Sequence, residues 1–306
     1  MIDNSIKVGF CVAYDWHFLA YSLPLIYNEA NIICLSVDKD HISWAKQSFI
    51  WDESEFYELI RSIDKSRKII VYTDNFHFAE LTPAKNEIRQ RTLMAEKMGK
   101  GGWHIQLDCD EYFLDFDRFV EYLKKLPAQR YKFNLSCQLI TVFKKVDDGY
   151  LFVYPAKRKD FEFLQIATRD PLYEHGRRNG YFNILADFLI VHQSWARGEA
   201  EILQKLSNWG HINDFDIDPY FQFWQGVNVN NFKKIKNFHP IQPSSWSALK
   251  FIEAKSVNEL IVKFRQAPFP GLDPLTRFLK NSILASGLMS RISALYKMIF
   301  YKDVSK

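Results

Sequence analysis

Paired acidic residues are the feature of this sequence best suited to chemistry. Asp108-Cys109-Asp110-Glu111 directly follows the apolar run from Trp103 to Leu107. Residues i and i+2 at the end of a strand point the same way, so we expect Asp108 and Asp110 to face one site. Two carboxylates held close repel each other and favour a cation, and hard oxygen ligands suit Mg²⁺ or Mn²⁺ together with substrate phosphates. The alternative is a helix cap, in which Asp110 or Glu111 begins the next helix.

The first half of the chain alternates strand and helix patterns. We predict strands over 6–13, 31–37, 68–72 and 103–107, and helices over 18–28, 53–62 and 82–98. This alternation predicts an α/β fold, in which a mostly parallel sheet is flanked by helices. In such sheets, ligands bind beyond the carboxyl ends of the strands. Three of the predicted strands end in carboxylates, which are Asp38 with Asp40, Asp74, and Asp108 with Asp110.

The second half is less regular. Strands are predicted over 133–143 and 150–154, joined by a turn at 147–149, and a further strand lies within 181–192. A helix is predicted over 199–209. No internal repeat or low-complexity linker is present, so we expect one compact unit.

Two stretches resemble a known family. The segment from Asn86 to Phe113, with its LDCDE sequence, resembles the core of bacterial family-2-type glycosyltransferases of the GT-A fold, in which an arginine-bearing helix precedes an apolar strand and an LDxDE motif. The segment from Val191 to His211 is similar to a stretch with His, Arg, Glu and Lys that follows in several of these enzymes. The two stretches cover about 50 residues, and the order of the predicted strands extends the likeness over 5–212.

The resemblance implies a GT-A-like Rossmann-type fold and an activity. The implied reaction moves a sugar from a nucleotide-diphosphate donor, a UDP-sugar by preference, to a hydroxyl of a glycan or lipid-linked acceptor, with inversion. The expected setting is cell-surface polysaccharide biosynthesis. The leaving nucleoside diphosphate gains negative charge as the glycosidic bond breaks, and a divalent cation with an arginine would offset that charge.

The resemblance also implies a metal centre. Asp110 matches the residue that binds Mn²⁺ or Mg²⁺. Asp108 matches the residue that reaches the donor ribose or sugar, through the metal or a water molecule. His192 matches a downstream histidine that completes the metal shell.

Other matched positions would bind the donor. Asp38 matches an acidic residue that contacts the nucleoside. Arg91, or failing that Arg89, matches an arginine that faces the diphosphate or the sugar. The usual P-x-Y-N-E stretch after the first strand is absent, and we expect Tyr14 to stack on a base and Asp15 to read it.

The catalytic base is harder to place. A hydroxyl acceptor needs a carboxylate within hydrogen-bond reach to take its proton. The Glu-Asp pair that usually supplies this base is absent. The candidates are Glu174 and Asp187, although Asp187 has the opposite strand parity to His192 if that strand is regular.

Composition bounds the remaining possibilities. The 306 residues are 47% hydrophobic and 25% charged, which is typical of a globular protein. The four cysteines lack CxxC spacing, no apolar run reaches membrane-spanning length, and the N-terminus does not resemble a secretory signal, so a cytoplasmic protein is expected. Phosphate-loop, GxGxxG and GxSxG motifs are absent. The alternatives are a nucleotidyltransferase of similar fold and a non-catalytic GT-A-like binding protein.

The net positive charge of the chain is concentrated in its C-terminal tail. Between Leu275 and Lys306 there are six basic residues and one acidic residue, against a net charge of +4 for the whole chain, so the near-neutral remainder argues against nucleic acid as a partner. The tail has an amphipathic helical pattern, which predicts a helix packed on the core, a helix bound to a partner, or peripheral contact with the anionic inner face of the cytoplasmic membrane.

We therefore predict three regions. Residues 1–115 form a nucleotide-sugar-binding α/β half, and residues 116–250 form the acceptor-binding and catalytic half of the same GT-A domain. Residues 251–306 form an amphipathic helical tail.

Overall fold

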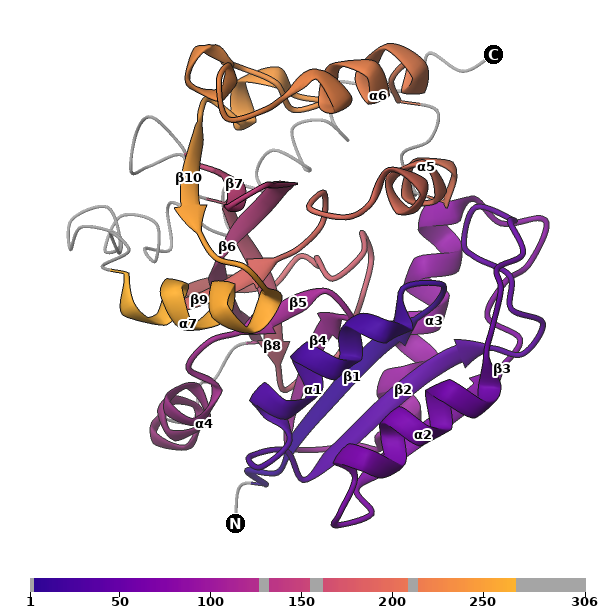
Figure 1. The fold of residues 1–306 in the computed structure, drawn as a ribbon. Coiled ribbons are helices and arrows are strands. Elements are labelled where there is room, and N and C mark those ends of the chain that lie inside the picture. The colour runs from indigo at the N-terminus through magenta and orange to yellow at the C-terminus, as the bar shows by residue number, and fades with distance from the viewer. Residues whose placement is uncertain (1–2, 127–131, 155–161, 209–213, 268–306) are drawn as a thin grey trace, which may run out of the picture.

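A parallel sheet forms the first half of the molecule. The computed structural model describes residues 3–126, 132–154, 162–208 and 214–267. Strands β1 (Ile6–Val12), β2 (Ile32–Asp38), β3 (Ile69–Asp74) and β4 (Trp103–Asp108) pair in parallel in the order β3-β2-β1-β4 (Figure 1). The α/β fold with a largely parallel central sheet, predicted from the alternating pattern, is confirmed.

Helices cover both faces of these strands. α1 (Leu19–Ile26) and α2 (Glu53–Ile63) lie on one face, and α3 (Pro83–Lys97) lies on the other (Figure 1). α3 begins where Thr82 caps it, because the Thr82 hydroxyl accepts a hydrogen bond from the backbone N–H of Lys85 at 3.4 Å and Pro83 follows. Pro24 lies within α1, which is shorter than predicted.

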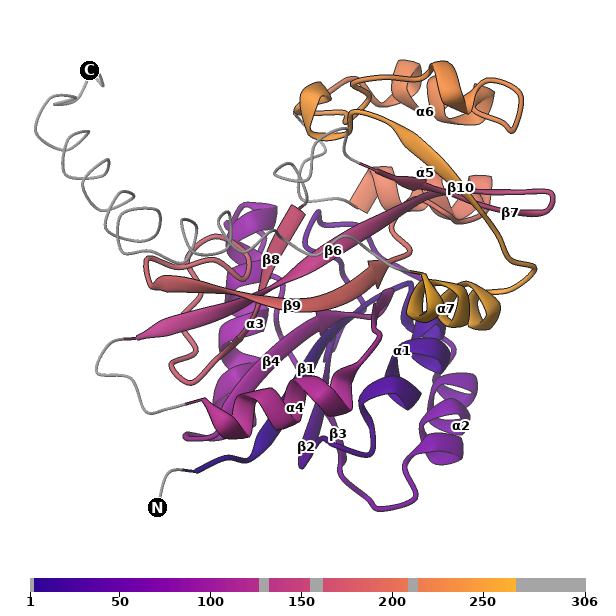
Figure 2. The same ribbon diagram turned by 90° about the vertical axis from the view of Figure 1, so that its left-hand side faces the viewer.

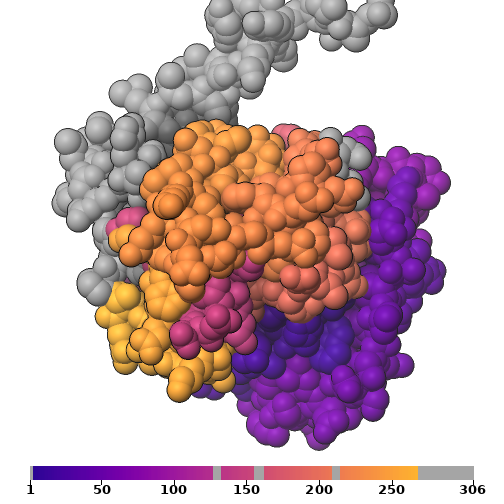
Figure 3. Space-filling view, turned by 45° about the horizontal axis from the view of Figure 1, so that its top comes forward, coloured from indigo at the N-terminus to yellow at the C-terminus, as the bar shows by residue number. Residues whose placement is uncertain are grey.

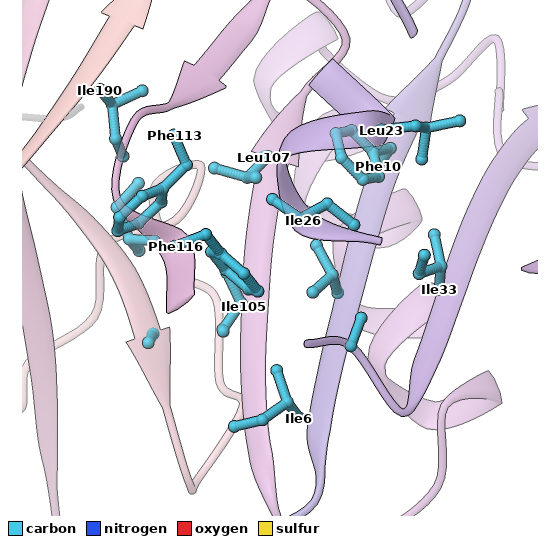
Figure 4. Packing of buried hydrophobic residues seen from close by; sticks show 14 of the residues in the cluster. Ile6, Phe10, Leu23, Ile26, Ile33, Ile105, Leu107, Phe113, Phe116 and Ile190 are labelled. Carbon is cyan, nitrogen blue, oxygen red and sulfur yellow. The ribbon is translucent and has the colours of Figure 1, made fainter. Parts of the chain in front are cut away.

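Apolar side chains fill the layer between the sheet and α1. Phe10 and Leu107 of the central strands meet Leu23 and Ile26 of α1 in a continuous buried cluster (Figure 4). Every residue of β1 is buried, as expected for a strand with helices on both faces. The carboxyl ends of these strands therefore rest on a rigid core.

The sheet continues through antiparallel strands. Within the described residues ten strands form one sheet, and β4 pairs with β8 (Glu162–Thr168), which pairs with β6 (Phe133–Val146). β6 also pairs with β7 (Gly149–Val153) and, in parallel, with β9 (Phe182–His192). The predicted strand pair joined by a turn is confirmed, as is the strand within 181–192.

The helix-cap interpretation of the acidic cluster is wrong. Glu111 begins a short strand, β5 (Glu111–Phe113), which pairs antiparallel with β9 and places Glu111 opposite His192. Pairing wins here because Tyr112 and Phe113 are both fully buried by it. The next helix, α4 (Phe116–Lys125), starts only afterwards.

The remaining elements close the top and side of the molecule. α5 (Glu199–Asn208) follows β9, and α6 (Ile217–Gly226) precedes β10 (Leu249–Glu253), which pairs with β7. The orange segment that includes α6 forms a continuous cap beside the indigo N-terminal half (Figure 3). α7 (Val257–Gln266) packs beside α1 at the side of the sheet (Figure 2).

Among the described residues, no helix has the length and apolar character needed to cross a membrane. The predicted tail helix over 275–306 lies outside the described residues.

Candidate functional site

A cavity of about 650 Å³ opens at the carboxyl ends of the parallel strands. β1 lies between β2 and β4 in the sheet. The chain runs from β1 to β2 and β3 on one side and then crosses back to β4 on the other side. This reversal of strand order is the switch point at which open α/β sheets bind ligands. The volume is in the range of cavities that bind small molecules. The second half of the chain contributes the opposite wall, including His192, Trp195, Lys205, Asn208 and Trp246.

Asp108 is held between two arginines. Its Oδ1 accepts a hydrogen bond from Arg91 at 2.9 Å, and its Oδ2 accepts one from Arg177 at 2.8 Å. Burial alone would raise the pKa of Asp108, but the guanidinium groups of Arg177 and Arg91 hold it below its ordinary value. Both arginines line the cavity, so the carboxylate fixes two cations at its wall.

Arg177 is a site residue that sequence reasoning missed. It donates two hydrogen bonds to Glu111, at 2.7 and 2.8 Å, and one to the backbone carbonyl of Gln106 at 3.1 Å. Glu111 is 1% exposed, so this is a buried bidentate pair. Arg177 lies in an irregular segment before β9, where no sequence pattern predicts its position. Only the tight turn between His175 and Arg178 brings it to the strand ends.

Asp110 faces a second group of cations. Its Oδ1 lies 3.4 Å from His192 Nε2, and its Oδ2 accepts a hydrogen bond from Arg197 at 2.5 Å. Burial would raise the pKa of Asp110, whereas His192 and Arg197 lower it well below its usual range. The pairing of β5 with β9 brings His192 here, so the predicted proximity of Asp110 and His192 is present in the structure.

Arg197 joins the segment that follows β1 to this group. Besides its bond to Asp110, it donates to Asp15 Oδ2 at 3.0 Å. Asp15 and its neighbour Tyr14 both line the cavity, and Tyr14 packs edge-on against Phe49 with ring centres 6.4 Å apart. Tyr14 and Asp15 therefore lie where a bound ligand could meet them.

The donor set for a metal ion is small. Asp110 Oδ1 and His192 Nε2 offer one oxygen and one nitrogen to the cavity, whereas both oxygens of Asp108 are bound by arginine. The described residues contain no group of three or more His, Cys, Asp or Glu side chains placed to hold a metal. Mg²⁺ usually takes one or two protein carboxylates plus substrate phosphates and water. The Asp110–His192 pair thus fits a divalent cation only if a phosphate ligand completes the shell.

The other predicted donor-binding residues differ in their placement. Arg91 lines the cavity, whereas Arg89 donates to the backbone carbonyl of Asn75 at 3.3 Å and lies 4.3 Å from the ring centre of Phe78. Asp38 also lines the cavity. Its two oxygens accept backbone N–H bonds from Asp40, Ile42, Phe76 and His77. Asp38 thus fixes the loops after β2 and β3, and its contact with a nucleoside stays a prediction.

The two predicted bases do not line the cavity. Glu174 is exposed beside the cavity segment 175–178. Asp187 is exposed within an irregularity of β9, because Cys137 pairs with Ala186 whereas the next residue of β6 pairs with Leu189. The strand is therefore not regular, and the parity argument does not hold for it. Their role as base stays a prediction that this geometry does not favour.

Glu162 is a carboxylate on the cavity wall that sequence reasoning missed. It begins β8, lies opposite Leu139 of β6 and has His192 and Arg178 among its electrostatic neighbours. Its carboxylate takes part in no hydrogen bond or ion pair within the described part of the chain. It is therefore available to accept a proton.

Lys205 is a second missed cation on the cavity wall. Its side chain is 13% exposed, and its Nζ lies 3.9 Å from Asp110 Oδ2. Burial, and then the nearby charge of Arg197, lower the pKa of Lys205 to about 8. Lys205 lies within the segment 191–211 that resembles the glycosyltransferase family, but the resemblance implies no role for it. α5, which carries it, begins where Glu201 accepts a hydrogen bond from the backbone N–H of Gly198 at 2.9 Å.

Comparison with known proteins adds little to this geometry. No family model matches the chain, and no curated protein matches its sequence. Solved structures that match include one titled as S. aureus TarS 1-349, with a TM-score of 0.36 and 10% identity, covering 75% of this chain and 74% of that one. A TM-score this low does not assign an activity.

Proposed function

We propose that this protein is a glycosyltransferase that moves a sugar from a nucleotide-diphosphate donor to an acceptor hydroxyl. The observation that carries the proposal is the convergence of Arg91, Arg177 and Lys205 with the Asp108 and Asp110 pair on one cavity at the switch point of an α/β sheet. Fixed cations suit a diphosphate, and they act most strongly in a site that excludes water. The donor we favour is a UDP-sugar, and the acceptor is a glycan or lipid-linked hydroxyl of cell-surface polysaccharide synthesis.

Asp110 and His192 are the residues that would hold Mn²⁺ or Mg²⁺ in this function. The ion would supply positive charge to the diphosphate as it leaves. Arg91 and Arg177 contribute charge of their own, and Asp108 keeps both guanidinium groups oriented before substrate arrives. Because these groups are already fixed, little reorganisation is needed when charge develops on the leaving group.

Glu162 is the base that this geometry favours. Asp15, Asp108, Asp110 and Glu111 are each paired with an arginine, so their carboxylate oxygens are already engaged. Glu162 has no such partner among the described residues and faces the same cavity. It would take the proton of the acceptor hydroxyl as that oxygen attacks the sugar from the side opposite the diphosphate, which gives inversion.

A donor panel tests the proposal. Wild-type protein is screened by thermal shift and by release of nucleotide from UDP-glucose, UDP-galactose, UDP-N-acetylglucosamine and their GDP counterparts, with and without Mn²⁺. We expect a UDP-sugar to stabilise the protein and to turn over only with the metal present. Asp110→Asn should abolish turnover, and Glu162→Gln should lower kcat by about 10²–10⁴ with little change in donor affinity.

Exposed Asp117→Asn on α4 is the matched control for these variants and should keep full activity. Donor turnover that is unchanged in Asp110→Asn would contradict the metal role. Binding of a UDP-sugar without any transfer or hydrolysis, across a broad acceptor set, would instead indicate a non-catalytic binding protein. Absence of nucleotide binding would remove the proposal altogether.

Peripheral contact with an anionic membrane is also proposed, on the charge and amphipathic pattern of residues 275–306 alone. A lipid-linked acceptor would be presented at such a surface. The tail would then hold the catalytic domain near its substrate without crossing the bilayer.

A further inference from the structure

The cavity-facing side of α5 carries two polar side chains whose bonding is incomplete. Lys205 and Asn208 both line the cavity. They are three residues apart on one helix, so they lie next to each other on its surface. Lys205 contacts Asp110 only at 3.9 Å, and Asn208 donates one hydrogen bond to Gln204 of its own helix, so each side chain keeps bonding capacity toward the cavity.

Lys205 is a cation without sufficient anionic partners. Its ammonium group can donate three hydrogen bonds, yet within the described residues it makes none. Its nearest carboxylate oxygen, Asp110 Oδ2, is 3.9 Å away and already accepts a hydrogen bond from Arg197. A buried charge is costly unless it is paired and hydrogen-bonded. An anionic group entering the cavity would satisfy Lys205.

The side-chain oxygen of Asn208 lacks a hydrogen-bond donor among the described residues. The residue is 8% exposed, and its Nδ2 donates to the backbone carbonyl of Gln204 at 2.7 Å. Its Oδ1 is buried and has no hydrogen-bond partner among the described residues. Leaving a buried acceptor unsatisfied is unfavourable, so the side chain is suited to a ligand that brings a donor. A hydroxyl group is such a donor.

We infer that Lys205 and Asn208 form a sugar-phosphate subsite, in which Lys205 binds the phosphate that carries the sugar and Asn208 accepts a hydrogen bond from a hydroxyl of that sugar. The inference rests on the proposed function and extends it. A sugar phosphate presents an anion and a hydroxyl side by side, as the two residues require. The acceptor is the less suitable occupant, because Lys205 lies next to Asp110, where the diphosphate is held.

The subsite acts on the bond that breaks. When the bond between the sugar C1 and the phosphate oxygen breaks, its electron pair stays on that oxygen, and a new bond forms between C1 and the acceptor oxygen. Lys205 stabilises the phosphate by donating a hydrogen bond while keeping its proton, and the hydroxyl proton goes to the base. Binding should therefore depend on Lys205 for any ligand with the second phosphate, and on Asn208 only when the sugar is present.

Isothermal titration calorimetry with UMP, UDP and the UDP-sugar that gives the largest thermal shift separates these contributions. Lys205→Met should weaken binding of UDP at least tenfold and leave binding of UMP within twofold, and Lys205→Arg should restore most of the loss. Asn208→Ala should leave binding of UDP within twofold and weaken binding of the UDP-sugar at least fivefold. Exposed Lys124→Met on α4 is the control and should change neither.

Circular dichroism and thermal unfolding establish that each variant is folded, and Lys205→Gln replaces Lys205→Met if the latter does not fold. Wild-type affinity for UDP in the lysine variant would overturn the inference while leaving the proposed function intact. Equal losses of UDP and UMP binding would do the same, because they indicate a general structural effect. If wild-type protein binds no UDP, the inference and the proposed function fail together.

Discussion

Arg177 shows what a single buried charge does in this protein. It bridges Asp108 and Glu111, two acidic side chains that the chain places three residues apart at the end of β4. Sequence alone marked the acidic residues and left their partner unidentified, because Arg177 is 66 residues from Glu111 and lies in an irregular segment. The two carboxylates are close together in the sequence and follow a predicted strand, so a local pattern identifies them. Arg177 comes near them only when the chain folds.

Removing Arg177 should destabilise the fold. Arg177→Met leaves the buried Glu111 carboxylate with the backbone N–H of Asp108 but without its cationic partner, and breaking a buried ion pair in this way typically costs roughly 3–5 kcal/mol in the free energy of unfolding. Urea unfolding followed by circular dichroism measures the loss. Arg178→Met, at an exposed neighbouring position, should change stability by less than about 1 kcal/mol.

A second substitution tests the cause of this loss. Adding Glu111→Leu to Arg177→Met removes the unpaired carboxylate, so part of the lost stability should return. A double variant no more stable than the single one would show that packing, rather than the uncompensated charge, makes Arg177 important.

At the scale of elements, the pairing of β5 with β9 builds the site. The register that places Glu111 opposite His192 also brings His192 beside Asp110. The strands and helices of the first half were predictable because apolar runs and polar breaks are local in sequence. β5 and the irregularity in β9 were not, because a three-residue strand has no period of its own and exists only through its partner.

A buried histidine of β4, His104, makes the stability of the fold depend on pH. His104 is 1% exposed, and burial, followed by the charge of Lys7, lowers its pKa to about 4. The unfolded chain takes up a proton on this histidine below pH ~6.5, whereas the folded state does so only near pH ~4. The contribution of His104 to the free energy of unfolding is therefore constant above pH ~6.5 and falls by up to about 3 kcal/mol as the pH drops to ~4.

Comparing His104→Leu with wild type isolates this contribution from the carboxylates that titrate in the same range. The free energy of unfolding is measured by urea titration at pH 8 and at pH 4.5. The variant should lose less stability on acidification than wild type, and exposed His175→Leu should behave as wild type does. Equal acid sensitivity in wild type and His104→Leu would refute the role of His104.

At the scale of the whole molecule, the charge of the tail predicts a surface preference. Deleting residues 275–306 should reduce sedimentation of the protein with vesicles that contain anionic lipid. Binding of the full-length chain to these vesicles should weaken as the salt concentration is raised. Vesicles of neutral lipid serve as the control. Unchanged sedimentation after the deletion would assign the tail a purely structural role.

The sequence by itself determined the alternation of strands and helices, the acidic cluster at the end of β4 and the general kind of chemistry those carboxylates suit. These features depend on residues close together along the chain, where periodicity and chain direction suffice. Only the tertiary structure decided that each carboxylate is held by arginine, that Arg177, Glu162 and Lys205 share the cavity, and that Asp187 and Glu174 do not line it. Contacts between distant segments are set by packing and strand register, which leave no local pattern in the sequence.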